Sequence, residues 1–214
     1  MELTRALARR RMVRAFAPDP IDRDTLDDLL DRARRAPSAG NTQATAFVVL
    51  DTPATTAAYW DVTLPPPRRA GFRWSELLSA PALVLVTTRP AAYPARYAAA
   101  DKVATGLGAG TGAWPVPYWW VDAGAVIQNI LLLAVDAGLG ACLFGPFEHE
   151  AAVIRRFDLD ADTRIVASIA LGRPRPDTPG RSARRPRPPR DAVIHRPPLG
   201  STAPDQSRVP DPGP

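Results

Sequence analysis

Residues 10–16 of the chain read RRMVRAF, and residues 36–43 further along read APSAGNTQ. The first stretch carries three arginines within five positions, and guanidinium groups form forked, charge-assisted hydrogen bonds to phosphate oxygens. The second stretch presents Ser, Asn and Gln side chains from a turn, where they can meet the polar edge of a flat ring. Either stretch alone is typical of a solvated surface, so the interpretation depends on both occurring in this order.

A third basic block lies near the C-terminus, where Arg185 and Arg187 precede the sequence DAVIH at residues 191–195. In their order and rough spacing, the three blocks resemble the FMN-dependent nitroreductase family over about residues 9–195. The resemblance implies an α+β fold, a nitroreductase-like sandwich whose small central and mostly antiparallel sheet is flanked by helices. It also implies an intertwined homodimer with FMN at the interface and an extended C-terminal arm that embraces the partner.

The composition agrees with one globular domain and argues against nucleic acid as a partner. The chain has 214 residues, of which 45% are hydrophobic, enough for a sizeable core. Its net charge of +5 comes entirely from the final 42 residues, which hold nine arginines and four aspartates. The rest of the chain is neutral, so we expect no basic nucleic-acid surface on the folded domain.

The sequence offers no residue pattern for a metal site or an intramolecular disulfide. Cys142 is the only cysteine and lies in an apolar run, and neither His149 nor His195 has neighbours at metal-ligand spacing. Neither a secretory signal nor an uninterrupted apolar stretch of about 18 residues is evident. We therefore expect a cytoplasmic protein without a membrane partner.

Hydrophobic periodicity predicts helices that alternate with about four strands. The expected strands cover residues 47–50, 82–88, 141–144 and 165–171, and the expected helices cover residues 2–11, 22–35, 55–60, 121–137 and 148–157. The helix over 121–137 is apolar nearly all round, which indicates burial in a core or an interface. Its narrow polar face consists of Asp122, Gln128, Asn129 and Asp136.

The periodicity fails between residues 89 and 120, and this stretch is expected to be a long mobile loop with an aromatic end. Its glycines lack the preceding strand and the following helix that a dinucleotide-binding loop needs. After residue 172 the texture changes again, because the final 42 residues hold 12 prolines. We expect an FMN-binding domain over 1–172, an arm over 173–200 that completes the cofactor site and the dimer, and a disordered tail over 201–214.

The resemblance assigns the cofactor's phosphate end to the first basic block. Arg10 and Arg14 match the basic positions of the family motif and would hold the FMN phosphate and the ribityl chain. Arg11 is the variable residue between them, and Met12 stands where the family usually has a hydroxyl side chain. The C-terminal arginine pair would complete the phosphate clamp.

The resemblance assigns the flavin ring to two further segments. The turn that meets the edge of the isoalloxazine ring is matched by Pro37, Ser38, Ala39, Asn41 and Gln43. Gly145 and Pro146 match the loop beside the reactive N5 atom, where the backbone N–H of Gly145 would reach N5. Proline has no backbone N–H, so only one of two amide contacts remains there.

The implied activity is electron transfer from NAD(P)H through FMN to a nitroaromatic, a quinone or a similar small acceptor. Trp114 and Tyr118 would line the entrance for this acceptor, and no side chain is assigned as a catalytic acid or base. Two alternatives stay open. One is a flavin-dependent dehydrogenase or desaturase in natural-product biosynthesis, and the other is a flavin-binding or nucleic-acid-associated protein without turnover.

Overall fold

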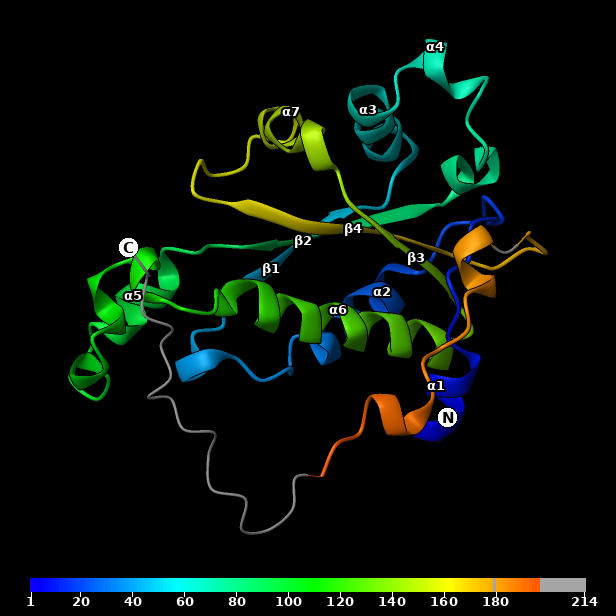
Figure 1. Cartoon of the computed structure of the whole chain (residues 1–214). Coiled ribbons are helices and arrows are strands. Elements are labelled where there is room, and N and C mark those ends of the chain that lie inside the picture. The colour runs from blue at the N-terminus through cyan, green and yellow to red at the C-terminus, as the bar shows by residue number, and fades with distance from the viewer. Residues whose placement is uncertain (179, 197–214) are drawn as a thin grey trace, which may run out of the picture. The chain divides into compact units, whose positions relative to one another are not determined.

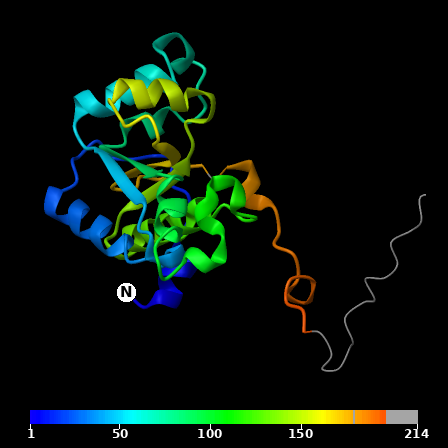
Figure 2. The same cartoon turned by 90° about the vertical axis from the view of Figure 1, so that its left-hand side faces the viewer.

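The computed structural model describes residues 1–178 and 180–196, and the expected tail over 201–214 lies outside these described residues. The chain divides into two units, residues 1–179 and residues 180–214, which are considered separately. The first unit holds all the strands and α-helices of the described chain (Figure 1). The described part of the second unit carries the short 3-10 turns Arg181–Arg184 and Arg190–Ala192, drawn in orange (Figure 2).

Four antiparallel strands form a sheet in the order β1-β2-β4-β3. Their bounds are Thr45–Leu50 for β1, Ala82–Thr88 for β2, Gly140–Phe144 for β3 and Arg164–Gly172 for β4. The two central strands, β2 and β4, are buried almost throughout, which explains their uninterrupted apolar runs. The small antiparallel sheet that the sequence predicts is confirmed, with each strand end within two residues of its expected place.

Helices cover both faces of this sheet (Figure 1). The bounds are Arg23–Ala33 for α2, Pro53–Thr63 for α3, Tyr118–Asp136 for α6 and Glu150–Arg156 for α7. Alternate side chains of β2 divide the core between the faces. Val84 and Val86 pack with α2 and α6, whereas Leu83 and Leu85 pack with α3 and α7.

The segment after α1 (Leu3–Arg9) adds a partial strand along β3. Met12 forms a parallel bridge with Ala141, and the backbone N–H of Val13 donates to the carbonyl of Ala141 at 2.9 Å. Phe16 then forms an antiparallel bridge with Pro174. The first arginine block is therefore held in extended form beside β3, and so close to the loop that follows β3.

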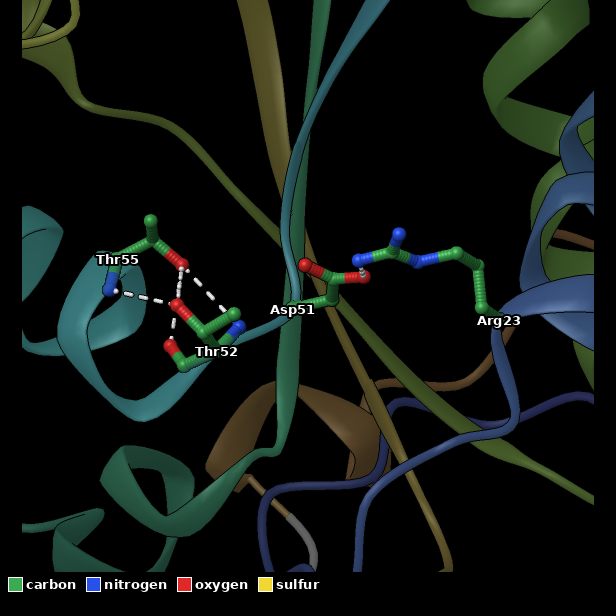
Figure 3. A network of polar contacts seen from close by, with 4 residues as sticks. All are labelled: Arg23, Asp51, Thr52 and Thr55. Carbon is green, nitrogen blue, oxygen red and sulfur yellow. Dashed lines mark hydrogen bonds and ion pairs between the residues drawn. The ribbon is translucent and has the colours of Figure 1, made fainter.

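The connection between α2, β1 and α3 shows how local sequence fixes a helix start (Figure 3). Thr52 and Thr55 form a capping box, in which each side chain accepts a hydrogen bond from the other residue's backbone N–H at 3.2 Å. Pro53 occupies the first turn of α3, where its missing N–H costs nothing. The nearby ion pair between Arg23 and Asp51 spans 3.7 Å with an exposed guanidinium, so it adds little stability.

The stretch from 89 to 120 differs from the expected irregular loop. It contains the helix α5 (Ala92–Tyr97) and three 3-10 turns, Val103–Thr105, Leu107–Ala109 and Thr111–Ala113. Helix α4 (Pro66–Arg69) and the 3-10 turn Ser75–Ser79 were also not expected. These elements have one or two turns each, too short to show a period of 3.6 residues in the sequence.

Helix α6 is the central helix of the domain. Its 19 residues are long and apolar enough to cross a membrane by length and composition alone, which is weak evidence because core helices meet the same criterion. Ala123, Val126, Ile130 and Ala134 are buried against the sheet and α2, and this packing accounts for the apolar sequence.

Candidate functional site

Arg14 and the loop after β3 share one cavity of about 360 Å³. Arg10, Met12 and Arg14 alternate along the extended segment beside β3, and β3 runs directly into Gly145 and Pro146. The cavity has mainly aromatic walls, formed by Trp60, Phe72, Trp74, Phe144 and Phe147. The structure thus brings together Arg14 and the predicted N5 loop, which lie far apart in the sequence.

The guanidinium groups of Arg10 and Arg14 are available for an anion. Both residues are half-buried, and neither side chain forms an ion pair with a carboxylate of the described residues. The guanidinium of Arg14 lies over the ring of Trp74, 4.9 Å from the ring centroid, and reaches the carbonyl of Met12 at 3.4 Å. A positive charge held by a ring face keeps its donors free for a bidentate ligand such as a phosphate.

Arg11 is occupied by Asp177, a residue that the sequence analysis did not single out. The carboxylate of Asp177 accepts hydrogen bonds from the Arg11 side chain and, at 2.7 Å, from the backbone N–H of Arg14. Its side chain is only 3% exposed, so this is a built contact rather than a surface pair. Nothing in the sequence distinguishes Asp177 from the other aspartates of the basic C-terminal region.

Met12 and Cys142 belong to the core beside the cavity. The sulfur of Met12 accepts a weak hydrogen bond from the backbone N–H of Leu143 at 3.4 Å. Its side chain packs with the apolar cores on both faces of the sheet. Burial raises the pKa of the Cys142 thiol, although the charge of Arg14 acts in the opposite direction. A buried, protonated thiol is a poor nucleophile, which agrees with the sequence interpretation.

The loop after β3 ends in a strained residue. Phe147 has φ of 44° and exposes 78% of its surface, although its ring closes over Gly145. A Cβ atom added to Gly145 would lie 3.3 Å from that ring, so a larger residue there would crowd it. A large exposed aromatic in a left-handed conformation fits a residue that meets a ligand or a second chain.

The predicted ring-binding turn has an unusual backbone. Gly40, Asn41 and Gln43 have φ of 59°, 54° and 52°, and only the first of them lacks a side chain. The hydroxyl of Ser38 accepts from the N–H of Gln43 at 3.0 Å, and the Gln43 amide donates to that of Asn41 at 2.9 Å. Asn41 and Gln43 are exposed, so their remaining amide donors and acceptors face outward.

Helices α5 and α6 hold this turn in place. Asp122 of α6 accepts from the N–H of Ala39 at 2.9 Å, and Arg96 of α5 donates to the carbonyl of Gly40 at 2.8 Å. The hydroxyl of Tyr93 also donates to Asp122, at 2.8 Å. Burial, and then the Asp122 carboxylate, raises the pKa of Tyr93 far above its ordinary value, so this hydroxyl stays a donor.

The predicted acceptor residues lie beside the turn but differ in burial. Trp114 is 7% exposed, packs edge-on against Tyr93, Tyr97 and Trp119, and donates from its indole nitrogen to the carbonyl of Leu107 at 3.1 Å. The expectation of a mobile loop is therefore wrong at Trp114, whose ring is packed. Tyr118 is 42% exposed and borders, with Trp114 and Ala39, a cavity of about 460 Å³.

The two parts of the predicted site lie at opposite ends of α6. The turn is bonded to Asp122 near the start of the helix, whereas the N-terminal amino group pairs with Asp136 at its end. Arg11 lines a cavity with Leu131 and Val135, also near that end. At 1.5 Å per residue, the helix from Asp122 to Leu131 and Val135 spans roughly 14–20 Å, so one copy of the first unit does not bring the two parts together.

Arg185 and Arg187 lie in the second unit, outside the folded domain that carries the other predicted contacts. Both are exposed and stand between the two 3-10 turns of that unit. Their role as a phosphate clamp therefore stays a prediction.

Comparison with known proteins settles the family. A model of the Nitroreductase family matches residues 7–173. The chain belongs to this family. It is therefore assigned to the oxidoreductases, and its α+β sandwich is the nitroreductase fold.

Individual relatives are moderately similar. A 4-nitrobenzoate reductase from Pseudomonas putida is 29% identical over 189 residues, which cover 78% of this chain and 82% of the relative. An NADH dehydrogenase from Thermus thermophilus is 27% identical over 183 residues, covering 79% and 85%. A structure described as a nitroreductase in complex with FMN, from Exiguobacterium sibiricum, superimposes with a TM-score of 0.69 at 18% identity and covers 91% and 97%.

Proposed function

We propose that two copies of this chain bind FMN between them and transfer electrons from NAD(P)H to a nitroaromatic, a quinone or a similar small acceptor. The observation that carries this proposal is the division of the site. Half-buried arginines without a carboxylate partner lie near one end of α6, and a left-handed turn rich in amides lies near the other. In a second copy with the reverse orientation, the turn would lie beside the arginines of the first copy, and the arginines would lie beside the turn of the first copy.

The residues present fit FMN, which combines a dianionic phosphate with a flat polar ring. Arg10 and Arg14 would hold the phosphate end, with Arg185 and Arg187 of the arm, since their charges lack a carboxylate partner among the described residues. Gly145 would offer its N–H to the ring at the end of β3. Ser38, Asn41 and Gln43 of the second copy would meet the ring edge. FMN, when bound, supplies the two-electron chemistry, and the protein positions it.

The surface of α6 supports a homodimer. Val121 is 51% exposed, Gly124 and Gln128 are exposed as well, and Leu132 and Val135 are half-buried. These positions fall on one face of the helix at spacings of three to four residues. A largely apolar face on the longest helix is typical of a surface that a second chain covers.

Two relatives support the direction of electron flow. One is named as a 4-nitrobenzoate reductase and the other as an NADH dehydrogenase. A nicotinamide donor and a nitroaromatic acceptor are therefore the first substrates to test. Among the described residues that line the cavity of Arg14 and Gly145, Glu148 is the only carboxylate, which agrees with chemistry that the cofactor supplies.

The test is the visible spectrum of the purified protein. We expect a yellow protein with one FMN for each chain, bleached by NADH or NADPH without oxygen and restored by a nitrobenzoate or a quinone. A colourless protein that FMN cannot reconstitute overturns the proposal. A yellow protein that neither nicotinamide reduces, but that a natural-product precursor bleaches, identifies the desaturase alternative. A bound flavin that no donor reduces identifies a binding protein without turnover.

A further inference from the structure

One buried carboxylate joins two separate segments of the domain. Asp122 is 6% exposed, and no ion pair between it and an arginine, lysine or histidine occurs within residues 1–178 and 180–196. The same oxygen atom, Oδ2, accepts from the hydroxyl of Tyr93 at 2.8 Å and from the N–H of Ala39 at 2.9 Å. In the sequence this residue belongs to the narrow polar face of the helix, and the structure shows that it is buried.

The stability of α6 alone does not explain a buried carboxylate at residue 122. Removing an acid from water is unfavourable unless hydrogen bonds replace its hydration. An apolar residue would suit α6 better at this position if packing were the only demand. The two donors that compensate Asp122 come from α5 and from the turn over residues 38–43, so the acid connects these segments.

Helix α5 holds the same turn through a row of side chains. Tyr93, Arg96 and Tyr97 are spaced three and four residues apart and so share one helical face. The two terminal nitrogens of Arg96 bind Asp101 at 2.8 and 2.7 Å, which leaves its Nε for the carbonyl of Gly40. The Arg96 guanidinium lowers the pKa of Asp101 to about 2, so this pair persists over the ordinary pH range.

The turn needs such support because its backbone is unfavourable by itself. Asn41 and Gln43 adopt left-handed conformations that residues with a Cβ atom rarely take. Gly40 is left-handed too, and a Cβ atom there would come within 2.6 Å of the ring of Tyr97. The contact leaves no room for a side chain, so α5 and the turn fit each other closely.

We propose that Tyr93, Arg96 and Asp122 are positioning residues, which hold the turn over residues 38–43 in the shape that receives the flavin ring. Helix α5, which lies in the same stretch of chain as Trp114, then sets the geometry of the turn over residues 38–43. It also shapes the cavity that Tyr97 and Trp114 line. This inference rests on the proposed function, because the turn meets a flavin only if FMN binds.

The test compares Tyr93→Phe, Asp122→Ala and Asp122→Asn. Hydrogen–deuterium exchange of the free protein reports on the turn, and FMN titration reports on binding. We expect exchange of the amides over 39–43 to speed up in Tyr93→Phe and Asp122→Ala, with FMN bound about tenfold more weakly. Asp122→Asn keeps an oxygen acceptor, so its FMN affinity should stay within about threefold of the wild-type value. The absorption band of bound flavin should shift only in the first two variants.

Ser168→Ala is the matched control. It breaks a buried hydrogen bond of 2.8 Å between Tyr59 of α3 and Ser168 of β4, which belong neither to the turn nor to the helices α5 and α6 that hold it. A similar fall in melting temperature is expected, without faster exchange over 39–43. Unchanged exchange or unchanged FMN affinity in Tyr93→Phe and Asp122→Ala overturns the inference alone. A wild-type protein that binds no FMN overturns the proposed function and the inference together.

Discussion

The three arginines of the first block look equivalent in the sequence, but their contacts in the structure differ. Arg11 is paired with Asp177, whereas Arg10 and Arg14 keep their charges without a carboxylate partner in the described residues. An arginine that is already neutralised contributes less to a new anion than one that is not. The structure therefore divides this motif into a structural contact and two candidate phosphate ligands.

Replacing Arg14 and Arg11 in turn tests this division. Arg14→Ala should weaken FMN binding by about 1.5–3 kcal/mol, the range for a hydrogen bond to a charged group. Arg11→Ala should change it by less than about 1 kcal/mol, because its partner is Asp177. Fluorescence titration with FMN measures both, and riboflavin, which has no phosphate, should lose little affinity in either variant. Equal losses for the two variants would contradict the division.

Trp114 and Tyr118, the two predicted acceptor residues beside the turn, also differ in burial, and we expect them to differ in function. Trp114→Ala should lower the free energy of unfolding by about 3–5 kcal/mol, because it removes a buried ring from a cluster of aromatic side chains. Tyr118→Ala removes a ring that is 42% exposed and should cost less than about 1 kcal/mol. It should instead change kcat/KM for the electron acceptor. Chemical denaturation and steady-state kinetics of both variants decide whether Tyr118 belongs to the substrate entrance.

At the scale of elements, hydrophobic periodicity was sufficient for the sheet and for the longer helices. The apolar run of β2 has the same bounds in the sequence and in the structure, Ala82–Thr88. The sequence could not reveal α5, because a helix of six residues with Pro94 inside it has no visible period. For the same reason it could not show that Trp114 is packed, since its partners Tyr93 and Tyr97 belong to that unpredicted helix.

The attachment of α7 to β4 should depend on pH. Glu150 accepts from the Arg164 side chain and from the N–H of Ile165, each at 2.9 Å. The Arg164 contact holds the pKa of Glu150 below its ordinary value of 4.5. A pKa that is lowered in the folded state stabilises the fold above pH 4.5, and this stabilisation is lost as the pH falls through the folded value.

Glu150→Gln should therefore be less stable than the wild type at pH 7, and the difference should shrink below about pH 4.5. Urea unfolding at a series of pH values measures it. Glu148→Gln is the neighbouring control, since that carboxylate is 74% exposed and pairs with no arginine in the described residues. A constant difference across the acid range for Glu150→Gln would show that the ion pair does not act through its charge.

At the scale of the whole molecule, the arrangement of the site predicts how many chains are needed. The turn over 38–43 is bonded to Asp122, whereas Arg11 of the first basic block lies beside Leu131 and Val135, roughly 14–20 Å further along α6. No motif in one sequence states how two copies combine. The sequence blocks thus located the parts of the candidate site. Bringing these parts together depends on a surface between two chains, which the blocks do not specify. The exposed face of α6 is the surface that we expect a second chain to cover.

Gly124 offers a selective way to test that expectation. A Cβ atom built on Gly124 meets nothing within 4 Å, so Gly124→Arg leaves the single chain unstrained and even favours the helix. In a dimer that covers this face, the same change inserts a charged side chain into the interface. We expect Gly124→Arg to sediment as a monomer at micromolar concentration and to lose FMN.

Ala57→Arg on α3 adds the same charge to an exposed position on the other side of the sheet, and it should stay dimeric and yellow. A Gly124→Arg protein that remains a dimer with full FMN content would remove this face from the interface. Loss of the dimer with FMN retained would instead show that one chain holds the cofactor unaided. That second result would mean that one part of the site binds FMN without the other, because the two parts lie apart along α6 within a chain.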